Sequence, residues 1–505
     1  MAVLGAVAVM AAALAAVALA APLGSVKQVA GKAGCYTFDG ASAAGPGTCR
    51  NIRGGNGATS LAISPGGRFA YLDGYGHHNS TVVPVLSVFR RKSDGTLRQL
   101  PGKKGCFSPD GSSEDGPNTC TNARNLDSGD ATSLVISRDG KYLYVASQLQ
   151  IMSVRIGGVA IFRRNLKTGA LHQLAGKSGC VSATGESEDG PDTCTRAREI
   201  DSTSNVHITP DQKFLYASNY DGPPHSGIAV FKRSARSGQL HQLKGRNGCI
   251  TDDGTTEQSG TDVVCRKSPN LYNPWDVATP DNHFAYVPAT GDTPSTDLVQ
   301  AFERNAKGGL VPMSGPRGCV SDDGTSPGGP CVNGRGLFDA ERAVLSKDKH
   351  FIYTNSYRTP SPVAVLNRNL NTGKLSQRSG KAACISADGT SGDTSETCRD
   401  GRALSGGYAG ALAPNGRTLY YTEYTSNVNG ALTLFRVSPK TGAFHQLSGK
   451  DGCVSADGSS EDGANTCRKA RAVEGAYQVA LAAGGQDVYV SAYNGNGVAL
   501  FHATR

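Results

Sequence analysis

Three charged residues in this chain could carry out acid–base chemistry. Glu341 and Arg342 are adjacent, and Asp276 directly follows Trp275, the only tryptophan. A carboxylate serves as a general base, and a guanidinium holds a carboxylate or stabilises developing oxyanion charge. If the protein is a lactonase or cycloisomerase, we therefore expect Arg342 to be the anion-stabilising group and Glu341 or Asp276 to be the base.

Aromatic and polar residues near the same points of a sequence repeat are candidates for ligand binding. They are Trp275, Tyr408, Tyr477, Asn205 and Asp339. Aromatic faces with a few convergent polar groups are typical of pockets for small polar molecules. The alternative is that these side chains pack and pair between neighbouring repeats.

A Gly/Asp/Ser-rich loop bracketed by two cysteines organises the rest of the chain. One copy, from Cys453 to Cys467, reads CVSADGSSEDGANTC, and the first cysteines of successive copies lie 65 to 74 residues apart. An interval this regular indicates a repeat protein. The repeat places all fourteen cysteines in local pairs, which we expect to be disulfides: Cys35 with Cys49, Cys106 with Cys120, Cys180 with Cys194, Cys249 with Cys265, Cys319 with Cys331, Cys384 with Cys398, and Cys453 with Cys467.

Each repeat also contains segments with the composition of β-strands. In the second repeat these are Ala131 to Ser137, Lys141 to Ser147 and Gly158 to Arg164, followed by LHQL at 171–174. Four antiparallel strands in each of seven repeats predict an all-β fold, a seven-bladed β-propeller. The last repeat lacks its fourth strand, and Val26 to Val29 has that strand's pattern. We therefore expect the N-terminal strand to complete the last blade and close the ring.

The cysteine loops are expected to connect the outermost strand of one blade to the innermost strand of the next. All of them then emerge on one face, together with the loops between second and third strands. A disulfide that closes a loop of roughly fifteen residues stabilises the fold by about 3 kcal/mol in the chain-entropy model. Calcium bound by loop carboxylates such as Asp457, Glu461, Asp110 and Glu114 is the alternative use of these loops. No other metal or cofactor is expected.

The N-terminus has the composition of a targeting segment. Residues 1–21 are apolar or small and end in Ala18-Leu19-Ala20, which predicts a secretion signal, with an uncleaved membrane anchor as the alternative. Residues 22–505 then form a single propeller domain. Paired cysteines agree with export, because disulfides persist outside the reducing cytosol. We expect the protein to be extracellular.

Composition and motifs argue against several classes of function. The formal charge of +9 comes without a dense Lys/Arg run, so nucleic acid is not an expected partner. The chain has no HExxH motif and no phosphate-loop motif, which argues against zinc proteases of the HExxH type and P-loop nucleotide-binding proteins.

Strand–turn–strand phrases in the chain resemble a known family. They are SRDGKYLYVAS (137–147), TPDQKFLYASN (209–219) and APNGRTLYYTE (413–423), followed by phrases such as GVAIFRRN and TGALHQL. They resemble the seven-bladed lactonase-like propellers, which include phosphogluconolactonase and carboxymuconate-cyclising enzymes, and the YVTN-type surface propellers. This chain resembles a secreted, disulfide-rich variant of that superfamily.

We expect the protein to be an extracellular recognition scaffold. Its disulfide-bearing face would bind a small molecule, a carbohydrate, a cell-envelope component or a protein. One alternative is a secreted lactonase or cycloisomerase that acts on a carboxylated lactone at the central channel. The other is a purely structural envelope protein.

Overall fold

The computed structural model describes residues 24–504, except 79–80, 127–132, 149, 152–153, 221–225, 257–258, 260–261, 292, 294, 392–396 and 425–429. The expected secretion signal at residues 1–21 lies outside this range. No helix within it has the length and apolarity to cross a membrane.

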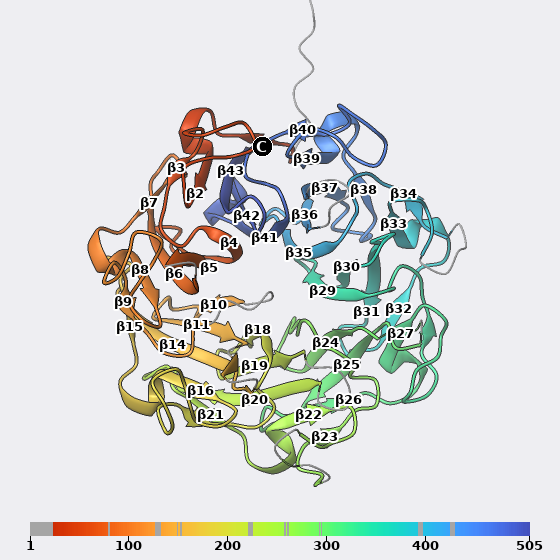
Figure 1. Ribbon diagram of the computed structural model, residues 1–505. Coiled ribbons are helices and arrows are strands. Elements are labelled where there is room, and N and C mark those ends of the chain that lie inside the picture. Colours follow the sequence, from red (N-terminus) through yellow and green to blue (C-terminus); the bar gives the residue numbers. More distant parts are fainter. Residues whose placement is uncertain are drawn as a thin grey trace, which may run out of the picture.

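The described chain folds into seven β-sheets arranged as blades around a central axis (Figure 1). The innermost strands are β4 (Asn56–Ile63), β10 (Leu134–Ile136), β18 (Thr203–Ile208), β29 (Ala340–Leu345), β35 (Gly407–Leu412) and β41 (Ala476–Leu481). The second strands are β5 (Phe69–His78), β11 (Tyr142–Ser147), β19 (Phe214–Asn219), β24 (Phe284–Ala289), β30 (Phe351–Ser356), β36 (Thr418–Glu423) and β42 (Asp487–Ala492). The third strands are β6 (Thr81–Arg91), β14 (Gly158–Arg164), β20 (Gly227–Arg233), β25 (Leu298–Arg304), β31 (Val363–Arg368), β37 (Ala431–Val437) and β43 (Gly497–Ala503).

The outermost strand of each blade is broken into two halves that pair with different parts of the third strand. The first halves are β1 (Val26–Gln28), β7 (Leu97–Gln99), β15 (Leu171–Gln173), β21 (Leu240–Gln242), β26 (Leu310–Pro312), β32 (Leu375–Gln377) and β38 (Phe444–Gln446). The second halves are β2 (Cys35–Thr37), β8 (Cys106–Ser108), β16 (Cys180–Ser182), β22 (Cys249–Thr251), β27 (Cys319–Ser321), β33 (Cys384–Ser386) and β39 (Cys453–Ser455). The breaks are short 3-10 turns: η1 (Gly31–Gly34), η2 (Gly102–Gly105), η3 (Gly176–Gly179), η4 (Gly245–Asn247), η6 (Pro316–Gly318), η7 (Lys381–Ala383) and η9 (Gly449–Gly452). A further 3-10 turn, η10 (Ala483–Gly485), joins β41 to β42.

The cysteine loops are more than connections, which refines the expectation from the sequence. Each first cysteine begins the second half of an outermost strand, and each second cysteine directly precedes a two-residue strand that pairs with that half in parallel. These edge strands are β3 (Arg50–Asn51), β9 (Thr121–Asn122), β17 (Thr195–Arg196), β23 (Arg266–Lys267), β28 (Val332–Asn333), β34 (Arg399–Asp400) and β40 (Arg468–Lys469). The seven expected disulfides are confirmed, with Cα–Cα distances of 4.8–4.9 Å. Each therefore fastens an edge strand to its blade.

We number the blades in chain order. Blade 1 is β4–β9, blade 2 is β10–β17, blade 3 is β18–β23, blade 4 is β24–β28, blade 5 is β29–β34 and blade 6 is β35–β40. Blade 2 also carries a small hairpin, β12 (Gln150–Ile151) with β13 (Val154–Arg155). Blade 7 combines β41–β43 with β1–β3 from the N-terminus, and β1 pairs antiparallel with β43. The predicted ring closure is confirmed.

A buried tyrosine in the second strand of every blade bonds to a glycine carbonyl of the next blade. The hydroxyl–carbonyl distances are 2.5–3.3 Å, and the pairs are Tyr71–Gly169, Tyr144–Gly238, Tyr216–Gly308, Tyr286–Gly373, Tyr353–Gly442, Tyr420–Gly24 and Tyr489–Gly95. In the other blades the receiving glycine lies in the turn after the third strand. In blade 7 this role is taken by Gly24, which precedes the N-terminal strand β1. The series therefore runs unbroken through the closure.

The receiving glycine cannot be replaced without strain. Gly169 has a φ of +77°, and a Cβ there would lie 2.2 Å from the Phe69 ring of the preceding blade. L-residues avoid this backbone region, whereas glycine enters it freely. The Thr-Gly turn phrase after the third strand is thus a contact between blades.

We predict that Tyr144→Phe lowers the free energy of unfolding by about 1–3 kcal/mol, because two buried polar groups lose their partner. These groups are the carbonyl of Gly238 and the Nε of Arg233, which donates to the same hydroxyl at 2.9 Å. The measurement is guanidinium unfolding with the disulfides intact. Tyr220→Phe, at a side chain 37% exposed, is the matched control. An equal loss in both variants would contradict the role of the inter-blade bond.

Candidate functional site

A cavity of about 560 Å³ lies at the mouth of the central channel, among blades 2 to 7. We call it the mouth pocket. Its described lining combines rings with polar groups: Gln148, Tyr220, Asn273, Trp275, Thr290, Gly291, Asp339, Glu341, Tyr357, Arg358, Tyr408, Tyr424 and Tyr477. These residues come from the starts of innermost strands and from the ends of second strands, which meet at one end of the blades.

Backbone bulges turn three of these side chains into the mouth. The pairing of innermost and second strands slips by one residue at Glu341 in β29, at Tyr408 in β35 and at Tyr477 in β41. A bulge leaves one residue outside the ladder and redirects its side chain. The bulged residues line the mouth pocket, and the residues that follow them line a deeper cavity.

Blade 4 also directs a side chain into the mouth, but it does so without a bulge. Pro274 has no N–H to donate, so a regular ladder cannot form through it. In the described structure this segment pairs with the second strand through two isolated bridges, Pro274 with Ala289 and Ala278 with Tyr286. Trp275 and Asp276 lie between the two bridges, and Trp275 lines the mouth pocket.

Aromatic rings line the mouth in two groups, which we together call the aromatic crescent. Trp275 stacks on Tyr220 with ring centroids 4.0 Å apart, and Tyr408 lies 3.8 Å from Tyr477. Tyr424 contacts both Tyr408 and Tyr477 at 5.8 and 5.6 Å, and Tyr357 lies 5.9 Å from Tyr408. The hydroxyl of Tyr477 donates to that of Tyr408. The crescent offers both ring faces and hydroxyl groups to a ligand.

Two carboxyl groups of blade 5 face the same pocket in different surroundings. Glu341 is only 3% exposed, and burial raises its pKa well above the usual range, which disfavours its charged form. Its Oε2 has no hydrogen-bond partner among the described residues. Asp339 instead accepts from the backbone N–H of Arg358 at 3.1 Å and lies 3.7 Å from that guanidinium. The lining therefore carries little net charge.

A third acid lies behind the pocket wall. Asp297 is fully buried and accepts from the backbone N–H of Gly291 at 2.9 Å. Burial raises its pKa to about 7. Asp297 is therefore a group near the mouth that changes charge around neutral pH.

The deeper cavity, of about 180 Å³, contains the other candidates from the sequence: Asn205, Asp276 and Arg342. Asp276 accepts from Asn205 Nδ2 at 3.1 Å, from its neighbour's N–H at 2.8 Å, and from the Ala343 N–H at 3.1 Å. Asn205 Oδ1 in turn accepts from the Ser133 hydroxyl at 2.9 Å. These bonds tie blades 2, 3, 4 and 5 together around the channel.

Arg342 separates the two cavities. Its Nε donates to the Tyr408 carbonyl at 3.0 Å, and its Nη1 donates to the Trp275 carbonyl. The guanidinium also lies 5.8 Å from the Trp275 ring and 5.9 Å from the Tyr408 ring. A guanidinium between two aromatic faces is stabilised by cation–π attraction. Arg342 thus supports the floor of the mouth pocket from below.

The structure therefore divides the residues picked from the sequence into two layers. Trp275, Asp339, Glu341, Tyr408 and Tyr477 share the mouth pocket, and Tyr408 and Tyr477 also line the deeper cavity. Asn205, Asp276 and Arg342 lie in the deeper layer, with the bonds just described directed to neighbouring blades.

Sequence reasoning missed a column of tyrosines at the ends of the second strands. Each lies four residues after the buried inter-blade tyrosine of its blade, and the column reads Tyr75, Gln148, Tyr220, Thr290, Tyr357, Tyr424 and Tyr493. Five of these seven residues are tyrosine, and three of the five line the mouth pocket. Aligning the repeats on the buried tyrosine would have revealed this column.

The loop acids proposed as calcium ligands bond to backbone groups. Asp457 and Asp110 each accept from the N–H two residues ahead at 2.9 Å, the geometry of an Asx turn. Glu461 accepts from the Ala403 N–H at 2.7 Å, and Glu114 accepts from the Gly54 N–H at 2.6 Å. Within the described ranges, no three His, Cys, Asp or Glu side chains gather as a metal site would require.

Comparisons with known proteins agree with this fold. A family model described as "Lactonase, 7-bladed beta-propeller" matches residues 181–247, which confirms the lactonase-like resemblance for that part of the chain. The search of curated proteins found no match.

Solved structures with a similar fold share little sequence with this chain. The periplasmic gluconolactonase of Pseudomonas aeruginosa is 15% identical, with 86% of this chain and 92% of that chain covered and a TM-score of 0.48. A candidate 6-phosphogluconolactonase from Bacteroides uniformis is 13% identical, with 85% and 90% covered and a TM-score of 0.48. Another from Bacteroides fragilis is 16% identical, with 77% and 83% covered and a TM-score of 0.43.

We predict that Glu341→Gln makes stability less dependent on pH. Because the folded-state pKa lies above the unfolded value, Glu341 favours the folded state below the unfolded pKa. This contribution is lost as the pH rises through the folded-state pKa. Between pH 4 and pH 8 the free energy of unfolding should fall further in the wild type than in the variant. The difference is about 1.4 kcal/mol for each pH unit of this range that lies between the unfolded and folded pKa values of Glu341. Unfolding free energies at both pH values measure this difference.

The exposed Glu303 provides the control, as Glu303→Gln. If Glu341→Gln and Glu303→Gln show the same pH dependence, Glu341 is not held neutral by its surroundings.

Proposed function

We propose that the protein is a secreted recognition propeller that binds a neutral saccharide, or a ring molecule derived from one, in the mouth pocket. The observation that carries this proposal is the aromatic crescent around the buried carboxyl group of Glu341 in one 560 Å³ cavity. Aromatic rings pack against the C–H faces of a sugar ring, while a few polar groups fix its hydroxyls. The near-neutral lining favours an uncharged ligand.

Export is part of this proposal. Seven disulfides indicate an oxidising compartment. The cysteine loops also reach the mouth end of the blades, since a Cβ on Gly76 in β5 would lie 2.6 Å from Glu114 of the adjacent loop. A larger partner, such as a cell-envelope glycan, would therefore meet the loops and the pocket on the same face.

A calorimetric titration with a panel of neutral mono- and oligosaccharides tests this function. We expect saturable binding that Tyr220→Ala weakens about tenfold, because the variant removes a ring face stacked on Trp275. Phe38→Ala removes a half-buried ring outside the pocket and should leave the affinity unchanged. If both variants bind like the wild type, the sugar is not in the mouth pocket.

Lactone hydrolysis is the second candidate activity. It is favoured by the family match at residues 181–247 and by Glu341 Oε2, a buried carboxyl oxygen without a partner in the described structure. Water would add to the lactone carbonyl while the ring C–O bond breaks, giving a hydroxy acid. Glu341 in its acid form would supply the proton to the leaving ring oxygen and regain a proton from the added water. In this scheme Glu341 acts as the general acid. Arg342 and Asp276 have a structural role, because their bonds to neighbouring blades hold the floor of the pocket in place.

A lactone-hydrolysis screen of the wild type, Glu341→Gln and Arg342→Ala tests that chemistry. If the protein is a lactonase, we expect Glu341→Gln to lower kcat about 100-fold or more, as for loss of a general acid. Equal turnover in the wild type and Glu341→Gln would remove Glu341 from the reaction. A loss confined to Arg342→Ala would restore the oxyanion role expected from the sequence.

A further inference from the structure

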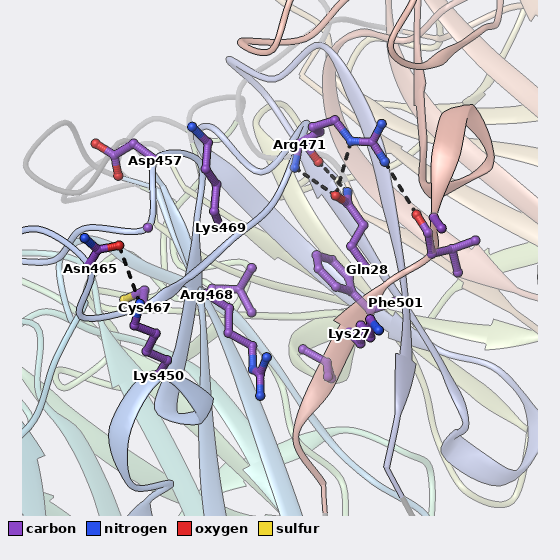
Figure 2. Close-up of a pocket in the computed structure, with 15 residues that line it drawn as sticks. Lys27, Gln28, Lys450, Asp457, Asn465, Cys467, Arg468, Lys469, Arg471 and Phe501 are labelled. Carbon is purple, nitrogen blue, oxygen red and sulfur yellow. Dashed lines mark hydrogen bonds between the residues drawn. The ribbon is translucent and has the colours of Figure 1, made fainter. Parts of the chain in front are cut away.

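A second pocket lies at the joint between blade 6 and the N-terminal strand of blade 7. It has a volume of about 500 Å³ and is formed by the Cys453–Cys467 loop, β40 and β1 (Figure 2). It shares no lining residue with the mouth pocket. We call it the closure pocket.

Basic side chains dominate the closure pocket. Lys27, Lys450, Arg468, Lys469 and Arg471 line it, and Asp457 is the one acid in its lining. Five positive groups around one open cavity outnumber the two nearby carboxylates, Asp457 in the lining and Asp451 beside Arg468, and leave a positive potential.

The two arginines have structural partners. Arg471 donates to the carbonyls of Thr48 and Gly31 at 2.9 Å and to Gln28 Oε1 at 3.4 Å, which fastens the N-terminal strand to blade 6 (Figure 2). Arg468 pairs with Asp451 through Nε at 2.6 Å. Both remain cationic, but their positions are fixed by these bonds.

The three lysines are available to a ligand. Lys450 has a long contact of 3.5 Å to Asn465 Oδ1. Lys469 stands beside Asp457 (Figure 2), whose pKa is lowered by hydrogen bonds from Ser459 and, to a smaller extent, by the charge of Lys469. Within the described chain, neither Lys27 nor Lys469 has a hydrogen bond or an ion pair closer than 4.0 Å. Three ammonium groups thus face one cavity.

No other joint of the ring has this combination. At the position of Lys27 the other blades have Arg98, His172, His241, Val311, Ser376 and His445. At the position of Lys469 they have Asn51, Asn122, Arg196, Lys267, Asn333 and Asp400. No joint except that of blades 6 and 7 has Lys or Arg at both positions. The basic pair is therefore not a general requirement for joining blades.

We propose that the closure pocket binds a saccharide that carries a phosphate or sulfate ester. Ammonium groups are compact charges with three donors each, and several of them together suit a tetrahedral oxyanion. A volume of 500 Å³ exceeds what a bare oxyanion fills and leaves room for the attached ring. Asn465 in the lining can bond to a hydroxyl of that ring.

Calorimetry at low ionic strength with inorganic phosphate, inorganic sulfate, glucose 6-phosphate and glucose tests this site. We expect glucose 6-phosphate to bind more tightly than either inorganic ion, and glucose not to compete with it. Lys27→Gln combined with Lys469→Gln should weaken glucose 6-phosphate binding about tenfold. Raising the salt from 0.05 to 0.5 M should weaken it as well, because the pocket is open to solvent.

The matched control is Arg98→Gln combined with Lys267→Gln. This variant removes positive charges at the same two repeat positions but at other joints, and it should leave the affinity unchanged. Equal affinity of the wild type and the Lys27/Lys469 variant would overturn the proposal. It also fails if Tyr220→Ala abolishes glucose 6-phosphate binding while the lysine variant retains it, because the anion would then occupy the mouth pocket. Tighter binding of inorganic phosphate than of the ester would refute the saccharide part.

Discussion

The hydrogen bond from a buried tyrosine to a glycine carbonyl of the next blade is the contact on which the ring depends. A blade of short strands cannot bury its own faces, and the seven-fold contact aligns neighbouring blades at a fixed height. Each tyrosine hydroxyl is buried, and the glycine carbonyl supplies the hydrogen-bond partner that a buried polar group needs. Gly24 continues the series where the chain begins its last blade, so the closure uses the same chemistry as every other joint.

The mouth pocket follows from that alignment. Because the blades share one height, the bulges at Glu341, Tyr408 and Tyr477 direct their side chains to a common point. Arg342 and Asp276 then fasten the layer beneath them through bonds to carbonyls, amides and ring faces of adjacent blades. A rigid floor of this kind lets aromatic rings present their faces without losing side-chain freedom on binding, which preserves affinity.

Much of this architecture could be predicted from the sequence, and the part that could not has physical causes. The cysteine period, the disulfides and the closing strand depend on spacing alone, and the structure confirms all three. The sequence could not show that Glu341 and Arg342, which are adjacent, lie in different cavities. A bulge in β29 turns the Glu341 side chain into the mouth pocket, and no particular residue type marks such a bulge in the sequence. The tyrosines at the ends of second strands, such as Tyr357 and Tyr424, were hidden because the alignment began from the innermost strands. The basic closure pocket joins Lys27 to Lys469, residues at opposite ends of the chain, and only the ring closure brings them together.

The fluorescence of Trp275 tests the central claim most directly, because it is the only tryptophan and it lies in the wall of the mouth pocket. Titration with a saccharide that binds by calorimetry should shift or quench its emission with the same midpoint, and Tyr220→Ala should move both midpoints together. Saturable binding that leaves the emission of Trp275 unchanged, and that survives Tyr220→Ala, would show that the ligand binds elsewhere and would contradict the account.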